Sequence, residues 1–303
     1  MQTSSVKSSQ ISAIIAALLD ASEKVSLKIK ELDNHSQIER RINGNRELSL
    51  HILVSDALKA TGLVSHAISD KNPEPLPCDG NEFIVTFESL DDSSLIDCTW
   101  AAGLIFAIWP NTDLLQGLDG HSIISAGIVC CGTRTTAIYY DVDEDSVNEY
   151  KLGSEGENNS WIKLKSKLSI KNTKLYGPGY CRATPESLAY MGKLDLGKLS
   201  KHSMRYTGGL APDCYSIFLK SGGIFCGLIP KSSQPKLGLL YACQPIAFLI
   251  EKAGGMSTDG EKSVLDVKIQ GFKQKIAFSC GSADEIKQIT NAIADFEARA
   301  INN

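Results

Sequence analysis

The sequence has no apolar run long enough to cross a bilayer and no excess of basic residues. Among 303 residues, 31 lysines and arginines stand against 35 aspartates and glutamates, which gives a formal net charge of -4. This balance leaves no electrostatic footprint for nucleic acid or an anionic membrane. The longest apolar stretches, such as residues 101–110, are too short for a transmembrane helix. We therefore expect a small molecule or a protein as partner, with no nucleic acid and no membrane span.

Targeting signals and zinc motifs are missing as well. The first ten residues, MQTSSVKSSQ, contain no apolar signal core, and the final INN is not a peroxisomal address. We expect an intracellular protein, in the cytoplasm or alternatively in an organelle. The nine cysteines form no CxxC pair and no zinc spacing, and most stand inside apolar runs. They are interpreted as reduced core residues rather than a disulfide framework.

The composition is that of a folded protein with one large or two medium domains, because 43% of the residues are hydrophobic and 22% are charged. A soft boundary divides the chain into an α+β half, residues 1–165, and an α/β half, residues 166–303. Loops are predicted at 34–45 and 141–160. Apolar periodicity predicts helices at 11–32, 47–61, 184–191, 213–219, 239–255 and 283–299. Strand patterns occupy 63–68, 83–87, 99–110, 174–176 and 223–226, with a hairpin inside 123–141.

The stretch FIVTFESLDDSSLIDC, which begins at Phe83, joins a strand pattern to a cluster of acids and hydroxyls. Its first five residues are nearly all apolar, a pattern typical of a strand buried on both faces. Three carboxylates follow within five residues, at Glu88, Asp91 and Asp92. Divalent metals such as Mg²⁺ bind a few carboxylates together with phosphate oxygens, so one hypothesis is a metal and phosphate site. The alternative, a solvated acidic turn that caps a helix through Asp92 or Ser93, fits these local residues equally well.

Three segments along the chain carry a resemblance to a known family: FESLDDSSLID, MRYTGGLAPD and LLYACQPIAFLIEKAGGMSTDGEKSVLD. They resemble the FDPLDGSS, RYxGGMxxD and LLYExxPxAxLxExAGGxxxxGxxxxLD patterns of the fructose-bisphosphatase and sedoheptulose-bisphosphatase family of sugar phosphatases. RTT at 134–136 and PGYCRAT at 178–184 resemble the sedoheptulose-bisphosphatase branch more closely. The resemblance spans nearly the whole chain. It implies an α/β fold, a layered αβαβα sandwich, in a homo-oligomer or as a subunit of a larger assembly.

The resemblance also implies a site that binds a sugar phosphate or sugar bisphosphate. In the family, two or three Mg²⁺ ions, with Mn²⁺ as an alternative, polarise the phosphoryl group and activate water. The positions that match the catalytic acids are Glu47, Asp70, Glu88 and Asp91, and the last three are the expected metal ligands. Arginine and lysine suit phosphate binding as bidentate and point-charge donors. The positions that match the phosphate and sugar ligands are Ser93, Ser94, Arg182, Arg205, Tyr206 and Lys236.

Several positions depart from the family pattern. Lys71 puts a cation where a second glutamate ligand is usual, and Ala242 replaces the glutamate that follows Leu-Leu-Tyr. Asp92 replaces the turn glycine, where a carboxylate should repel the substrate anion by at least ~1 kcal/mol. Gly238 stands where an arginine for the same phosphate is usual. Since Mg²⁺ tolerates little departure from octahedral geometry at ~2.1 Å, we expect a degenerate metal site.

Three functions are therefore weighed. The first is a family member that binds a sugar phosphate while its metal-dependent ester hydrolysis is weakened or lost. The second is an active Mg²⁺-dependent phosphoric monoester hydrolase of carbohydrate metabolism that uses the surviving carboxylates. The third is a non-catalytic structural subunit of a larger complex. An inositol-phosphate phosphatase is disfavoured, because the RYTGG and LLYACQP segments fit the sugar group better.

Overall fold

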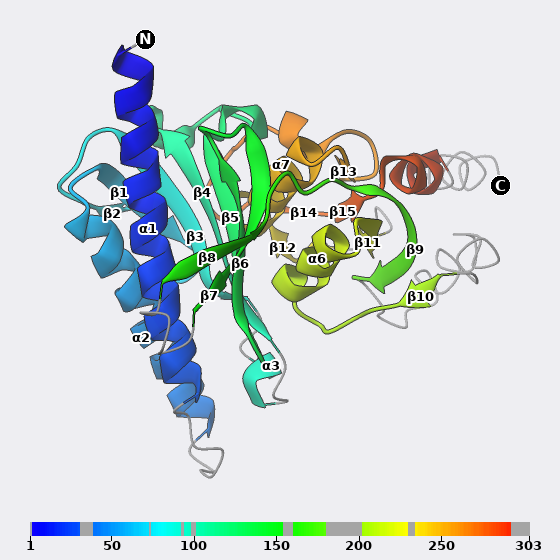
Figure 1. Cartoon of the computed structure of the whole chain (residues 1–303), viewed down its shortest axis with the longest axis horizontal. Helices are drawn as coiled ribbons and strands as arrows, with labels where there is room; N and C mark the ends of the chain where they lie inside the picture. The colour runs from blue at the N-terminus through cyan, green and yellow to red at the C-terminus, as the bar shows by residue number, and fades with distance from the viewer. Residues whose placement is uncertain are drawn as a thin grey trace.

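Five layers of helices and strands alternate in the computed structural model of the chain (Figure 1). The structure describes residues 2–30, 39–72, 74–91, 94–97, 101–153, 160–179, 202–229 and 234–291. A first helical layer covers one face of a large sheet, and a second lies between this sheet and a smaller one. A last helix packs on the outer face of the smaller sheet. The mixed α/β, layered αβαβα fold implied by the resemblance is confirmed.

The larger sheet has eight strands in the order β2-β1-β3-β4-β5-β6-β7-β8. β1 and β3 are parallel, whereas β3 to β8 pair antiparallel with their neighbours. The predicted hairpin is confirmed, because β5 and β6 pair across the turn at residues 132–134. The strands are β1 (Val64–Ser69), β2 (Leu76–Pro77), β3 (Phe83–Asp91), β4 (Ala102–Pro110), β5 (Ser125–Cys131), β6 (Thr135–Asp141), β7 (Ser146–Leu152) and β8 (Trp161–Lys165).

Both faces of the larger sheet are covered by helices: α1 (Gln2–Lys30) and α2 (Glu39–Ala60) on one, α6 (Leu210–Leu219) and α7 (Gln244–Lys252) on the other. Along β3, Val85 and Phe87 pack in the α1 and α2 cluster, whereas Ile84 packs in the α6 and α7 cluster. This two-sided burial explains the continuous apolar run of the segment. The apolar stripe of α1 faces the sheet, with Ile14 and Leu18 fully buried.

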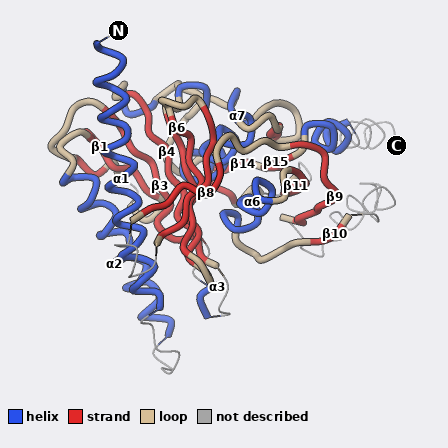
Figure 2. The backbone as a smooth tube through the Cα atoms, viewed as in Figure 1, coloured by secondary structure: helices blue, strands red, loops and turns tan. Residues whose placement is uncertain are grey.

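The smaller sheet has five strands in the order β10-β9-β11-β15-β13, and it lies at the far side of α6 and α7 in Figures 1 and 2. Its outer face is covered by the helix at residues 283–291, where Ile286 packs against Tyr176 and Ile224. A two-stranded ribbon, β12 (Leu237–Gly238) with β14 (Lys275–Ile276), stands apart from both sheets. The five strands are β9 (Lys171–Pro178), β10 (Ser203–Met204), β11 (Gly222–Gly227), β13 (Met256–Thr258) and β15 (Phe278–Gly281).

Two predicted loops are wrong in part. α2 begins at Glu39, inside the segment 34–45 that was expected to be a loop. The polar segment 141–160 contains strand β7, in which Asn148 is fully buried. The Asn148 side chain donates to the Glu144 carboxylate at 2.8 Å and accepts from the Lys167 backbone N–H at 2.8 Å. A buried polar residue whose hydrogen-bond partners lie inside the protein cannot be distinguished from an exposed one by its sequence. The predicted helix at 184–191 lies outside the described residues.

The cysteines in the described part of the chain are free thiols, and all of them except Cys78 are buried, as the sequence indicates. Two of the buried thiols, Cys214 of α6 and Cys280 of β15, lie close together, with their sulfur atoms 3.7 Å apart. Among the described helices, none combines the length and the apolar character that a membrane crossing requires.

Candidate functional site

Asp70, Glu88 and Asp91, here called the acidic edge, stand where β1 and β3 end. Because the two strands are parallel and Ser69 pairs with Phe87, the residues that follow, Asp70 and Glu88, lie at the same edge of the sheet. Neighbouring strands are about 4.8 Å apart. β3 continues through Glu88 to Asp91, with an irregularity of the ladder between them. The fold therefore gathers at one edge three acids that the sequence separates into two segments.

Asp91 is bound by the first turn of α6. Its Oδ2 accepts a hydrogen bond from the Ala211 backbone N–H at 2.6 Å, and its side chain is only 7% exposed. The first N–H groups of a helix have no intrahelical acceptor, so the carboxylate satisfies one of them. Opposite Asp91 in the ladder stands Gly103, where an added Cβ would lie 2.2 Å from the Ala211 Cβ. Asp91 thus ties α6 to the sheet at a point of very close approach.

Asp70 forms an ion pair with its neighbour Lys71. The distance from Lys71 Nζ to Asp70 Oδ2 is 3.1 Å, and both side chains are partly exposed. His51 of α2 lies beside this pair, stacked on the Phe87 ring with centroids 5.3 Å apart, and its Nδ1 is 3.1 Å from the Ser69 hydroxyl. Burial lowers the pKa of His51, Asp70 opposes this shift and Lys71 adds to it. The charges of Lys71 and Asp70 therefore both affect His51, in opposite directions.

The turn that carries Ala242, η4 (Leu239–Cys243), packs against this edge. It is held there by Thr86 of β3, whose hydroxyl donates to the Leu240 carbonyl at 3.3 Å. Burial raises the pKa of Tyr241, and the charge of Asp70 raises it further. Burial likewise raises the pKa of Cys243, with Glu88 and Asp91 among the contributing charges. Ala242 thus stands between two residues whose pKa values are raised by the charges of the acidic edge. Its own side chain is a buried methyl group, which cannot bind a metal.

No group of three or more histidine, cysteine, aspartate and glutamate side chains in the described part of the chain is arranged to hold a metal ion. Asp70 already faces an ammonium, and Asp91 already accepts a backbone hydrogen bond. The roles of Asp70, Glu88 and Asp91 as metal ligands stay predictions.

Arg205 and Tyr206 lie on the segment that leads into α6. Both are exposed, and the Arg205 guanidinium donates to the Met204 carbonyl at 3.2 Å. The segment is fixed by Asp213 of α6, whose Oδ1 accepts from the Thr207 backbone N–H at 2.8 Å. Asp213 is 4% exposed, and this burial raises the pKa of its carboxyl group. The first turn of α6 therefore connects the Arg205 segment to Asp91.

Asp213 is the residue of this region to which the sequence assigned no role. Its signal is the final aspartate of the MRYTGGLAPD segment, which matches the aspartate of the family pattern. Among the other expected ligands, Lys236 is exposed just before β12, and Ser94 is exposed at the start of α3 (Ser94–Asp97). Glu47 belongs to α2, but its side chain lies outside what the structure describes. Asp92, Ser93 and Arg182 are likewise outside the described residues.

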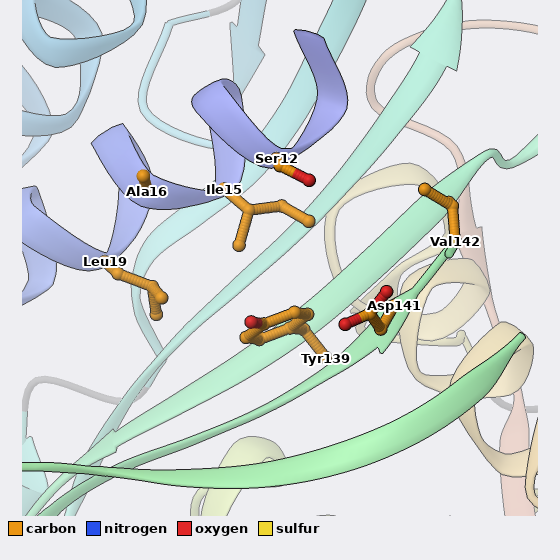
Figure 3. Close-up of a pocket in the computed structure, with 7 residues that line it drawn as sticks. All are labelled: Ser12, Ile15, Ala16, Leu19, Tyr139, Asp141 and Val142. Atoms are coloured by element: carbon orange, nitrogen blue, oxygen red, sulfur yellow. The ribbon is translucent and has the colours of Figure 1, made fainter. Parts of the chain in front are cut away.

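A small pocket of about 110 Å³ lies between α1 and the end of β6, away from this site. Figure 3 shows Ile15 and Leu19 of α1 above the Tyr139 ring, with Asp141 beside the ring. Tyr139 pairs with Gly127 in the ladder, whereas Asp91 stands opposite Gly103 near the other end of the strands. None of the expected site residues lines this pocket.

Known proteins share both the sequence pattern and this fold. A family model described as "Fructose-1-6-bisphosphatase, C-terminal domain" matches residues 170–294. The chloroplastic sedoheptulose-1,7-bisphosphatase of Spinacia oleracea is 35% identical over 251 residues, 80% of this chain and 64% of that protein. The class 1 fructose-1,6-bisphosphatase of Syntrophotalea carbinolica is 28% identical over 290 residues, 90% of this chain and 86% of that protein.

A solved structure agrees with these relatives. The crystal structure of a Toxoplasma gondii protein assigned as a sedoheptulose-1,7 bisphosphatase superimposes with a TM-score of 0.82 and 29% identity, covering 94% of both chains. The fold and these similarities place the chain among proteins related to sugar bisphosphatases. The chain belongs to the fructose-bisphosphatase and sedoheptulose-bisphosphatase family. It spans 64% of the length of the spinach relative.

Proposed function

We propose that the chain binds a sugar phosphate through the acidic edge and the Arg205 segment, while its metal-dependent hydrolysis of the phosphate ester is weakened or lost. The relatives are named for fructose-1,6-bisphosphate and sedoheptulose-1,7-bisphosphate hydrolysis, which supports a sugar bisphosphate as the ligand class. The observation that carries the proposal is the ion pair of Lys71 with Asp70, at 3.1 Å. A cation occupies the place where catalysis would need two carboxylates.

The binding half of the proposal is supported by the exposed cationic segment beside α6. Arg205 presents a guanidinium, which suits bidentate recognition of a phosphate, and Tyr206 is 46% exposed next to it. The Asp213 to Thr207 hydrogen bond ties this segment to the same helix turn that binds Asp91. A ligand bound at Arg205 would therefore be held by a segment that the same turn of α6 connects to Asp91 of the acidic edge.

Binding is tested by calorimetric titration with fructose 1,6-bisphosphate and sedoheptulose 1,7-bisphosphate. The wild type should bind at least one of them, and Arg205→Ala should bind about ten- to a hundredfold more weakly, since a hydrogen bond to a charged group contributes about 1.5–3 kcal/mol. Lys174→Ala is the matched control, because Lys174 is another exposed cation of the same half of the chain, on β9. Equal affinities of the two variants would contradict the role of Arg205.

Catalysis is tested by phosphate release with added Mg²⁺ or Mn²⁺. The proposal expects release by the wild type at or close to the uncatalysed background. Turnover that Asp91→Asn abolishes would establish the active phosphatase instead. Absence of both turnover and binding would favour the non-catalytic structural subunit.

A further inference from the structure

We propose that Lys71 takes the place of a divalent cation at the acidic edge, so that the phosphate of the ligand is received there without a metal. The inference rests on the proposed function for the identity of the ligand. Lys71 follows Asp70 directly at the end of β1, at the same sheet edge as Glu88 of β3. Its Nζ lies 3.1 Å from Asp70 Oδ2, an ion-pair distance.

The first step of the argument concerns the charges of the acidic edge. Clustered carboxylates disfavour one another's ionised form unless positive charge or hydrogen-bond donors compensate. Asp70 and Asp91 have such partners within the chain, because Asp70 has the Lys71 ammonium and Asp91 has the Ala211 N–H. The edge can therefore hold its carboxylates together with no added cation.

The second step concerns the reach of the Lys71 charge. His51 is 7% exposed on α2, and Lys71 is one of the groups that lower its pKa, whereas Asp70 raises it. The charge of the ammonium therefore lowers the pKa of a buried residue beside the acidic edge. A lysine ammonium is a compact point charge with three donors and a common phosphate ligand.

The third step concerns competition with a metal. A doubly charged ion about 5 Å from the Lys71 ammonium would bind about tenfold more weakly, even at the permittivity of water. The turn η4, which packs against β3, gives no compensation at Ala242, because this residue is 2% exposed and carries only a methyl group. Compared with the family pattern, the chain carries no carboxylate at Ala242 and a repelling charge at Lys71.

The test uses Mn²⁺ alone as probe, with free Mn²⁺ measured by electron paramagnetic resonance. Lys71→Glu should bind Mn²⁺ about a hundredfold more tightly than the wild type, because two units of charge change near a doubly charged ion. Lys71→Gln, which adds no new acid, should gain about tenfold and keeps the test decisive if Lys71→Glu does not fold. The matched control is Lys268→Glu, since Lys268 pairs with Asp119 at 2.7 Å elsewhere on the surface. It should bind Mn²⁺ as the wild type does.

Two results of this comparison would overturn the inference. One is a wild type that binds Mn²⁺ as tightly as Lys71→Glu, since the metal would then tolerate the ammonium. The other is a gain in Lys71→Glu no larger than in Lys268→Glu, since removal of the ammonium would then uncover no cation site.

A second titration separates this inference from the proposed function. Calorimetry with fructose 1,6-bisphosphate should give the same wild-type affinity with EDTA and with Mg²⁺, and a weaker affinity for Lys71→Gln under both conditions. Binding that EDTA abolishes would overturn the metal-free recognition while leaving the sugar phosphate ligand in place. No binding under either condition would overturn the proposed function, and the Mn²⁺ comparison would still decide whether Lys71 replaces a cation.

Discussion

The hydrogen bond between Asp91 and Ala211 gives a sharp prediction about the acid that ties α6 to the larger sheet. In Asp91→Ala, the Ala211 N–H loses its acceptor at a residue that is 0% exposed, so water cannot replace the carboxylate. A hydrogen bond to a charged group contributes about 1.5–3 kcal/mol, and a carboxylate near a helix N-terminus adds about 0.3–1 kcal/mol. We expect Asp91→Ala to lower the free energy of unfolding by about 2–4 kcal/mol.

Asp91→Asn separates the hydrogen bond from the charge. Its amide oxygen can still accept from the Ala211 N–H, so the loss should be near 1 kcal/mol. Urea denaturation followed by circular dichroism measures both variants. Asp56→Ala, at an exposed aspartate of α2, should stay within about 0.5 kcal/mol of the wild type. A cost for Asp91→Ala no greater than for Asp56→Ala would refute the role of Asp91 in tying α6 to the sheet.

Three further predictions concern neighbours of the site. Lys71→Gln should raise the pKa of His51, which an NMR titration measures. In the wild type, the pKa of His51 in the folded protein is lowered below 6.5, so stability falls as the pH drops below 6.5. His51→Gln should flatten this loss of stability. Burial raises the pKa of the Asp213 carboxyl above 3.8, so the stability contributed by its protonated form is present at low pH and is lost as the pH rises through the pKa of the folded protein. Above about pH 4, the free energy of unfolding of the wild type should therefore fall relative to that of Asp213→Asn, as denaturation measures. Gly103→Ala should lower the melting temperature and cost about 1–3 kcal/mol or more, because its Cβ would lie 2.2 Å from that of Ala211; an unchanged melting temperature would contradict the close approach.

The layered fold could be predicted because its signals are local or carried by long motifs. The run from Phe83 to Phe87 indicated a strand buried on both faces, and β3 is such a strand. The segment from Leu239 to Gly255 resembled the family over its whole length, and it forms η4 and α7 as a buried unit. Signals of this kind depend on residues that are neighbours in the chain.

The site was predicted less completely because its contacts join distant segments. The bond from Ala211 to Asp91 spans 120 positions, and no local pattern indicates it. Asp213 looked like one polar residue of an amphipathic segment, yet it fixes the backbone at Thr207. The error at β7 has the same origin, since Asn148 is buried through partners at Glu144 and Lys167. Polarity in a sequence indicates exposure only when such partners are absent.

The central claim is that the chain keeps the ligand site of its family while an internal ammonium has displaced the catalytic cation. Its most direct test is phosphate release from fructose 1,6-bisphosphate and sedoheptulose 1,7-bisphosphate with saturating Mg²⁺, comparing the wild type with Asp91→Asn. The account predicts that both proteins release phosphate at or close to the uncatalysed background rate. Release by the wild type well above that background, abolished in Asp91→Asn, would contradict it.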